Sequence, residues 1–254
     1  MRITWFGTAS LAVQTQRGRL LIDPFFPFPG SPTRVPADAY DGYVHILVTH
    51  GHFDHILSLP RLCQGERRRV HCTQTPFDTL KRRGVADDDL VRIAPGDVFE
   101  IDDMRVTACQ SRHVRFDSTI LRRTLLSPRM LRHARNLPRV AGGFLKYPEN
   151  GETLGFLIEG DGAQVFVLGS LNLAADVDYP TGMDLLVLPY QGTSDLLTPA
   201  IQIIDRLKPR AVLLDHFDDA FPPISNTVDT SDIQEYYAEK LPVNRLEPGQ
   251  SFTL

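Results

Sequence analysis

The chain has 254 residues and a mass of 28.5 kDa, with 42% hydrophobic and 23% charged residues, which are the proportions of an ordinary soluble globular protein. This composition excludes a disordered chain, a collagen and a disulfide-rich miniprotein, and the length allows a large core without covalent staples. The net charge of −4 argues against a general polyanion binder, so we expect no DNA binding. No apolar run approaches the roughly 20 residues of a membrane-spanning helix.

The cysteines and the first residues indicate a reducing compartment. Cys63, Cys72 and Cys109 lie far apart and show no CxxC spacing, which favours buried free thiols over a disulfide framework or a structural zinc site. Residues 1–6 lack the apolar stretch and small-residue cleavage site of a signal peptide, and they are typical of a first strand. We therefore expect a cytoplasmic protein.

Hydrophobic periodicity predicts a chain that alternates strands and helices. Strands are expected at 2–6, 10–16, 20–22, 45–48, 70–72, 90–93, 97–101, 104–110, within 153–168 as a hairpin, at 185–188 and at 211–214, and helices at 55–62, 76–83, 199–207 and 229–240, before a short C-terminal β segment. Five prolines predict a loop over 24–42. Because no repeat or linker interrupts this order, we expect a single domain over residues 1–254 with helices outside two packed sheets, carrying a basic helical insert at about 114–146.

A histidine cluster follows the buried strand 45–48. The segment from His50 to His55 reads H-x-H-x-D-H, and three histidines with one aspartate in this spacing are improbable by chance in a chain with eight histidines. Imidazole and carboxylate are good ligands for zinc, manganese and iron. In a tight turn the first two histidines can face one way and Asp54 and His55 another, so one loop can serve two neighbouring metal positions.

This segment resembles the signature of the metallo-β-lactamase superfamily of hydrolases. The opening residues 3–10 and the stretch from Leu20 to Pro24 are similar to the same family, in particular to the branch that includes ascorbate-6-phosphate lactonase. The resemblance covers most of the chain and is weakest over 112–146. It implies a four-layer αβ/βα sandwich with a two-metal site at the sheet edges.

The resemblance also implies two sets of ligands. His50 and His52 would hold the first ion, together with His113 from a later loop. Asp54 and His55 would hold the second ion, together with His216, which follows the late buried strand 211–214. The expected ion is zinc, or else manganese or iron.

Ser170 departs from the family pattern. It stands where an aspartate usually follows a glycine and bridges both ions, and Thr8 replaces a histidine often found in the opening turn. Two dications about 3.5–4 Å apart repel each other by on the order of 15–20 kcal/mol before their ligands are counted. We therefore expect one ion at His50, His52 and His113, with the second weaker or absent. Ser170 would contact a metal or its water, unless Asp176, Asp178 or Asp184 reaches the site instead.

The expected function is a metal-dependent hydrolase that directs metal-bound hydroxide at an ester, a lactone or a phosphodiester. Asp54 is the candidate catalytic residue that orients this hydroxide when the second ion is missing. Two alternatives stay open: a phosphodiesterase acting on nucleotides or phospholipid headgroups, and a non-catalytic metal- or ligand-binding member. Asp215, Asp218 and Asp219 flank His216 and are either solvated loop carboxylates or, for one of them, a partner of a ligating imidazole.

Residues 112–139 are strongly basic. They contain eight arginines and one acid, Asp117, for a net +7, which leaves −11 on the rest of the chain. Leucines interleave with the arginines, and Pro128 divides the run into two short helices. The segment begins beside His113, so a lid that captures a small anionic substrate through Arg112 and Arg115 is one interpretation. The others are contact with an anionic membrane surface, an oligomer contact and a solvated helical hairpin; the oligomeric state itself is open.

Overall fold

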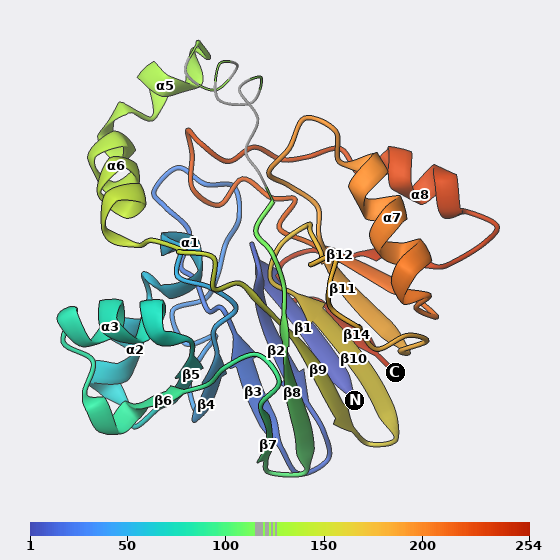
Figure 1. The fold of residues 1–254 in the computed structure, drawn as a ribbon. Helices are drawn as coiled ribbons and strands as arrows, with labels where there is room; N and C mark the ends of the chain where they lie inside the picture. Colours follow the sequence, from blue (N-terminus) through green and yellow to red (C-terminus); the bar gives the residue numbers. More distant parts are fainter. Residues whose placement is uncertain (115–118, 120–121, 123, 125) are drawn as a thin grey trace.

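Two seven-stranded sheets lie face to face in the computed structural model, which describes residues 1–114, 119, 122, 124 and 126–254 (Figure 1). The first sheet has the order β14-β1-β2-β3-β4-β5-β6, with bounds Ser251–Thr253, Arg2–Gly7, Ser10–Gln14, Arg19–Ile22, His45–Leu47, Arg69–Cys72 and Leu90–Arg92. The second has the order β13-β12-β11-β10-β9-β8-β7, with bounds Val243–Arg245, Val212–Asp215, Leu185–Pro189, Ala163–Leu168, Leu154–Gly160, Met104–Gln110 and Val98–Ile101.

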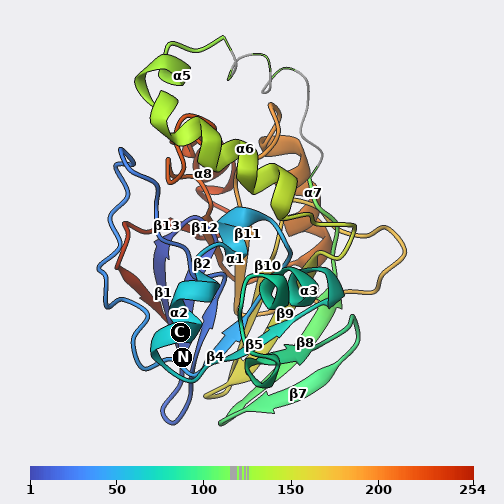
Figure 2. The ribbon, with the colours of Figure 1, turned by 90° about the vertical axis from the view of Figure 1, so that its left-hand side faces the viewer.

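Helices cover the outer faces of the sheets. Beside the first sheet lie α1 (Phe53–Ile56), α2 (Leu59–Gly65) and α3 (Gln74–Arg82), and beside the second lie α7 (Leu197–Leu207) and α8 (Ser231–Tyr237) (Figure 1). Helix, sheet, sheet and helix are the four layers expected from the sequence. Two further helices, α5 (Arg129–Arg132) and α6 (Leu137–Lys146), stand above the ends of the sheets in both ribbon views (Figure 2).

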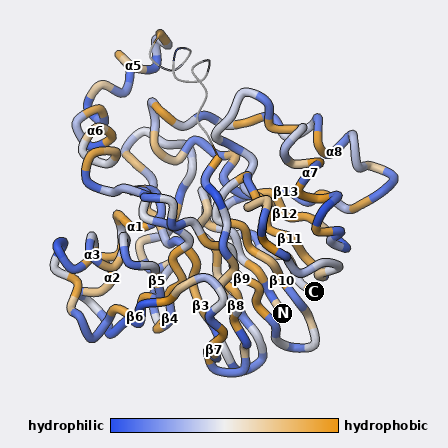
Figure 3. The backbone as a smooth tube through the Cα atoms, in the orientation of Figure 1, coloured by the Kyte–Doolittle hydropathy of each residue, from blue (hydrophilic) through white to orange (hydrophobic). Residues whose placement is uncertain are grey.

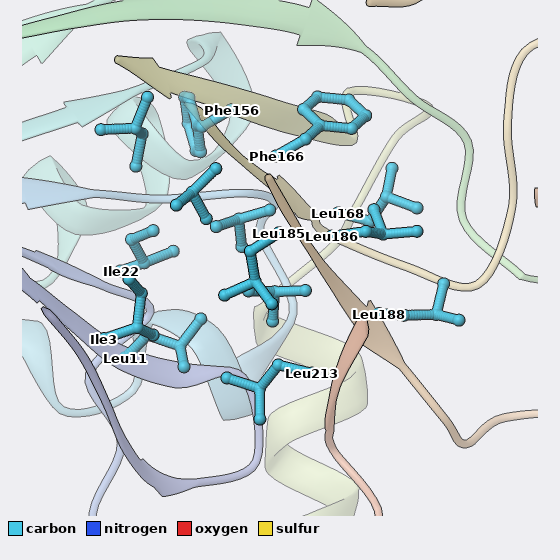
Figure 4. Packing of buried hydrophobic residues seen from close by; sticks show 14 of the residues in the cluster. Ile3, Leu11, Ile22, Phe156, Phe166, Leu168, Leu185, Leu186, Leu188 and Leu213 are labelled. Carbon is cyan, nitrogen blue, oxygen red and sulfur yellow. The ribbon is translucent and has the colours of Figure 1, made fainter. Parts of the chain in front are cut away.

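Apolar side chains from both sheets interlock to form the main core. Ile3, Leu11 and Ile22 of the first sheet belong to one cluster with Phe156, Phe166 and Leu213 of the second, all without solvent exposure (Figure 4). A second cluster fills the space between the first sheet and α1 to α3. Figure 3 shows the apolar residues following the central strands, as expected for elements buried on both faces.

The strand directions bring several strand ends to one edge of the sandwich. β3, β4 and β5 are mutually parallel, and so are β10, β11 and β12. β8 runs in the direction of β10, because each is antiparallel to β9. Residues that follow β4, β8, β10 and β12 in the chain therefore leave the sheets at the same edge. In open α/β sheets, ligands bind in crevices at the carboxyl ends of the strands.

The helix expected over 55–62 is two helices instead. α1 already begins at Phe53, inside the histidine-rich segment, and α2 starts after Ser58 with Pro60 in its first turn. Proline has no backbone N–H and its ring excludes the preceding turn of a continuous helix, so the chain restarts at α2. In the basic insert, α5, a 3₁₀ turn (Ala134–Asn136) and α6 follow Pro128, whereas most of the segment before Pro128 lies outside the described residues. None of the described helices is long and apolar enough to cross a membrane.

A histidine pair far from the strand-end edge couples the fold to pH. His45 Nδ1 lies 3.3 Å from His71 Nε2, and the His71 ring stacks on Phe99 with its Nδ1 buried and unpartnered. Burial, with a smaller contribution from His45, lowers the pKa of His71 to about 4. Burial also lowers the pKa of His45. The folded state therefore binds these protons more weakly than the unfolded chain does.

The substitution His71→Phe tests this coupling. A lowered histidine pKa means that the stability contributed by neutral His71 is complete above pH 6.5 and is lost as the pH falls toward 4. Between pH 7.5 and pH 4, the free energy of unfolding measured with urea should fall by up to roughly 3 kcal/mol more for the parent than for the variant. At pH 7.5 the variant should be at least as stable, since Phe removes an unpartnered buried nitrogen. Equal losses in both proteins would contradict this account.

Candidate metal centre

Three histidines from two sheets meet at the strand-end edge. His50 and His52 come from the segment after β4, and His113 comes from the segment after β8. One nitrogen from each of the three lies within 4.8 Å of the others. His50 Nε2 is 3.2 Å from His52 Nδ1, and the ring of His113 packs edge-on to both. The structure thus brings together the three side chains that the sequence assigns to the first ion.

Hydrogen bonds on the outer nitrogens orient two of these rings. The Thr49 hydroxyl donates to Asp23, which only accepts, so the neighbouring His50 Nδ1–H donates to Thr49 Oγ1 at 3.0 Å. His113 Nδ1 donates to the carbonyl of Val114 at 2.7 Å. In both rings Nε2 consequently keeps its lone pair for an ion, as is usual for ligating histidines.

A second donor group lies beside the first. Asp54, His55 and His216 also have donor atoms within 4.8 Å of one another. Asp54 Oδ2 is 3.2 Å from His216 Nε2 and 3.7 Å from His55 Nε2. The rings of His50 and His55 are 3.9 Å apart, so the two groups are adjacent. All three residues predicted for the second ion are therefore assembled.

Asp23 is a site-forming residue that the sequence reasoning missed. It follows β3 and is fully buried. Its carboxylate lies 2.7 Å from His55 Nδ1 and accepts hydrogen bonds from the backbone N–H and the hydroxyl of Thr49. The Asp-Pro pair in the sequence suggested only the end of a strand. Its role becomes visible only in the fold, where the end of β3 lies at the same edge as the histidines.

The backbone around His216 is held in an unusual conformation. His216 has φ +60°, and its N–H donates to the carbonyl of Thr8, itself at φ +47°. Asp218 accepts from the Thr8 N–H at 2.8 Å and from the Thr33 hydroxyl at 2.6 Å. Non-glycine residues rarely adopt positive φ, so this network offsets a local cost of about 1 kcal/mol or more at each position. Thr8 thus supports His216 through its backbone. In the family pattern, a histidine often stands at the position of Thr8.

Burial and mutual repulsion keep most of the imidazoles neutral. Burial lowers the pKa of His52 to about 4, and burial together with the neighbouring rings places the pKa of His50 well below its usual value. Burial also lowers the pKa of His113. His216 differs: burial opposes its protonation, but the hydrogen bond and charge of Asp54 raise its pKa to about 9. Neutral imidazole is the form that binds metal ions, so the first group is ready to accept one.

Ser170 occupies the position expected for a bridging carboxylate. It is buried after β10, and its Oγ accepts a hydrogen bond from the Val114 N–H at 2.9 Å. The preceding Gly169 allows this close approach, since a Cβ there would lie 2.4 Å from the Leu154 carbonyl oxygen and 2.6 Å from Thr49 Cβ. Asp176 and Asp184 do not replace the missing carboxylate, because they pair at the surface with Arg112 and Arg210. Asp178 is exposed.

A cavity of about 680 Å³ opens above both donor groups. Its walls are mostly apolar, from α1, α6 and the loops after β8, β11 and β12: Phe53, Val114, Phe144, Pro189, Leu196, Phe221, Pro223, Ile224 and Val228. The remaining described lining, apart from the donor residues, consists of glycine and uncharged polar side chains, and it contains no lysine or arginine. A ligand in this cavity would meet the imidazoles at the floor and hydrocarbon at the sides.

Of the two arginines expected to bind substrate, the described one, Arg112, does not line the cavity. Arg112 is exposed and its guanidinium is 3.7 Å from Asp176, away from the described lining of the cavity. Arg115 lies outside the described residues.

Two of the acids that flank His216 are engaged elsewhere or buried. Asp219 forms an ion pair with Arg129 at 2.6 Å. Asp215 is fully buried, and burial raises its pKa far above its usual range. Neither makes a described hydrogen bond to an imidazole.

The two sheets, their outer helices and the histidine-lined edge are those of a metallo-hydrolase. The Beta-lactamase superfamily domain matches residues 18–217, and the chain belongs to this superfamily. The expected fold and superfamily are confirmed, while the ascorbate-6-phosphate lactonase branch remains a prediction. Zn²⁺-bound PqqB from Methylobacterium extorquens has the same fold, with a TM-score of 0.64, 16% identity and coverage of 100% of both chains.

Curated relatives carry the name UPF0173 metal-dependent hydrolase. One from Agrobacterium fabrum is 31% identical over 44% of this chain and 48% of its own length, so the matched part spans about half of that relative. Another from Roseiflexus castenholzii is 26% identical over 98% of this chain and 96% of its own length. Their name agrees with the enzyme class expected from the sequence.

Replacing Asp23 by Asn tests whether this carboxylate positions the donors. The variant keeps one acceptor oxygen but exchanges the other for an amide NH₂, which cannot accept from His55 or Thr49, so its affinity for Zn²⁺ in competition with a chelator should fall about 10- to 100-fold. Asp219→Asn is the matched control, since it removes a buried, hydrogen-bonded carboxylate without touching a donor residue. Both variants should lose about 1–3 kcal/mol of unfolding free energy. Equal zinc affinities in the two variants would show that Asp23 is only structural.

Proposed function

We propose that this protein hydrolyses a carboxylic ester or lactone with a largely apolar substituent, using one metal ion held by His50, His52 and His113. The observation that carries the proposal is the cavity, in which two donor groups form the floor and the described walls hold hydrocarbon and uncharged polar groups. Such walls favour a substrate that is apolar around its reacting carbonyl. The described lining supplies no cationic side chain for the anionic substrate expected from the arginine-rich insert.

The donor set fits zinc better than a hard cation. Three imidazoles with lone pairs directed at one point are typical of catalytic zinc, whereas magnesium and calcium prefer oxygen ligands. When bound there, zinc supplies a Lewis acid for the attacked carbonyl and acidifies a water. Iron and manganese accept imidazole and carboxylate as well and remain alternatives.

The chain's own side chains would align the reactants around this position. Asp54 lines the cavity, and its carboxylate can accept a hydrogen bond from the attacking water, which orients that water. Because Ser170 Oγ accepts from Val114, its hydroxyl hydrogen is available to donate to an oxygen of the substrate. Phe53, Phe144 and Phe221 form apolar walls that exclude bulk water.

The second donor group leaves one other activity to consider. Asp54, His55 and His216 form a place for a second ion, although Ser170 supplies no negative charge to bind it. If a second ion does bind there, two adjacent ions suit phosphodiester hydrolysis. A phosphodiesterase is therefore the alternative enzyme. A protein that binds a metal or ligand without turnover is the alternative from another class.

Metal content distinguishes one ion from two. Purified protein loaded with Zn²⁺ and then desalted should contain about one ion per chain by elemental analysis, since the site lacks a bridging carboxylate. Ser170→Asp should raise the content toward about two, and His113→Ala should lower it well below one. About two ions in the parent chain would contradict the argument from Ser170. An unchanged content in His113→Ala would exclude the three-histidine site.

Substrate preference tests the apolar cavity. For p-nitrophenyl esters, kcat/KM should rise with acyl length from acetate to hexanoate, by up to about tenfold per added methylene. Phe144→Ala should reduce this preference about tenfold with little change for acetate, because Phe144 is half-exposed and lines the wall. Tyr236→Ala, at a surface outside the cavity lining, is the control.

Three results would overturn this assignment. Turnover of bis-p-nitrophenyl phosphate without turnover of esters would favour the phosphodiesterase. Ester hydrolysis that survives His52→Ala would place the reaction outside this site. Absence of turnover on both substrate classes in zinc-loaded protein would favour a binding protein.

A further inference from the structure

The segment from Leu126 to Pro148, which we call the α5–α6 arm, is fixed to the body at two points. The buried Asn136 side chain donates to the carbonyls of Pro29 and Pro222, at 2.9 and 2.8 Å. Arg129 Nη2 lies 2.6 Å from Asp219 Oδ2 and also donates to the Ser225 carbonyl. These anchors join the arm to loops of both sheets, so its outer side has a defined orientation above the sandwich (Figure 2).

The outer side of the arm presents apolar side chains to solvent. Leu126, Leu131 and Leu145 are 75%, 85% and 84% exposed. The exposed apolar positions recur three and four residues apart: Leu131, Ala134, Pro138, Ala141 and Leu145. Within α6 this spacing places Pro138, Ala141 and Leu145 on one face, opposite the inner face formed by Val140 and Gly143. Leu131 and Ala134 precede that helix, on α5 and the 3₁₀ turn. A single exposed leucine is ordinary, whereas exposed apolar residues that gather on one surface mark an interaction site.

Cations accompany this apolar face without any acid. Exposed cationic residues stand directly after the apolar positions, at Arg132, Arg135, Arg139 and Lys146. Residues 118–148 contain no aspartate or glutamate. Arg139 lies over the Phe28 ring at 5.2 Å, at the junction with the body, and Lys146 follows Leu145 at the other end of α6. An apolar face bordered by cations is typical of helices that lie in the surface of an anionic bilayer.

The arm also stands at the opening of the cavity. Phe144 is 49% exposed and lines the cavity wall, and its ring packs edge-on to Phe53 at 5.5 Å. Gly143 allows this approach, since a Cβ there would lie 2.7 Å from the Phe53 ring. The exposed apolar face is therefore continuous, through Phe144, with the apolar wall above the histidines.

We propose that the α5–α6 arm binds the surface of a bilayer that contains anionic lipid, with Leu131 and Leu145 entering the apolar boundary and the flanking cations facing lipid headgroups. A second copy of this chain is a poorer occupant, because a twofold contact would place the same cations against each other. The charge of the arm is complementary to phosphatidylglycerol or phosphatidylserine and opposite to that of the rest of the chain. Binding of this kind is independent of the reaction proposed above.

Sedimentation with vesicles tests the proposal without any measurement of turnover. The full chain should bind vesicles of phosphatidylcholine with roughly 30% phosphatidylglycerol and bind phosphatidylcholine alone at least tenfold more weakly. Leu131→Ser/Leu145→Ser should reduce binding to the anionic vesicles tenfold or more. Arg132→Gln/Lys146→Gln should reduce it about fivefold per cation and weaken its salt dependence.

Matched controls lie on other surfaces. Val98→Ser on β7 removes an exposed apolar side chain far from the arm, and Arg67→Gln/Lys208→Gln removes two exposed cations (Figure 1). Both should bind vesicles like the parent, and all variants should keep its circular dichroism spectrum. Failure of the parent to bind anionic vesicles, or equal losses in arm and control variants, would overturn the proposal. So would a parent dimer that the leucine variants convert to a monomer.

Discussion

The candidate site depends on imidazoles whose outer nitrogens are already engaged. His50 is oriented through Thr49, His55 through Asp23 and His113 through the Val114 carbonyl, so that the remaining nitrogens converge on common points. Gathering such groups without an ion is unfavourable, because each is desolvated and their lone pairs face one another. The two packed sheets hold them there, since their strand ends meet at one edge and the core behind them is closely packed.

Asp23 links this edge to the interior. One carboxylate serves both donor groups, through Thr49 to His50 and directly to His55. The hydrogen bonds of Ser170 and Asn172 serve the other sheet in a similar way, because both hold the peptide group between His113 and Val114, directly after the His113 side chain. When an imidazole is already held in place, metal binding costs little further side-chain entropy. This is the physical reason for such outer partners.

Much of this arrangement could be predicted from the sequence, and its failures have physical causes. Alternating residues identified the strands because each sheet has a buried face, and the HxHxDH spacing identified the metal-binding loop. His113 and His216 were located only through the resemblance to a family, since no local pattern distinguishes them. The roles of Asp23 and Asn136 could not be predicted, because each depends on partners far away in the chain. The apolar cavity was missed because single residues of several loops build it, whereas the arginines that suggested an anionic substrate are conspicuous in the sequence.

Anomalous X-ray scattering from zinc-soaked crystals tests the account most directly. Data collected on either side of the zinc absorption edge should show one strong peak at the point shared by His50 Nε2, His52 Nδ1 and a nitrogen of His113. Weaker density or none should appear beside Asp54, His55 and His216. A strong peak only at that second group, or no peak at either, would contradict the assignment of the first three histidines as the primary metal site.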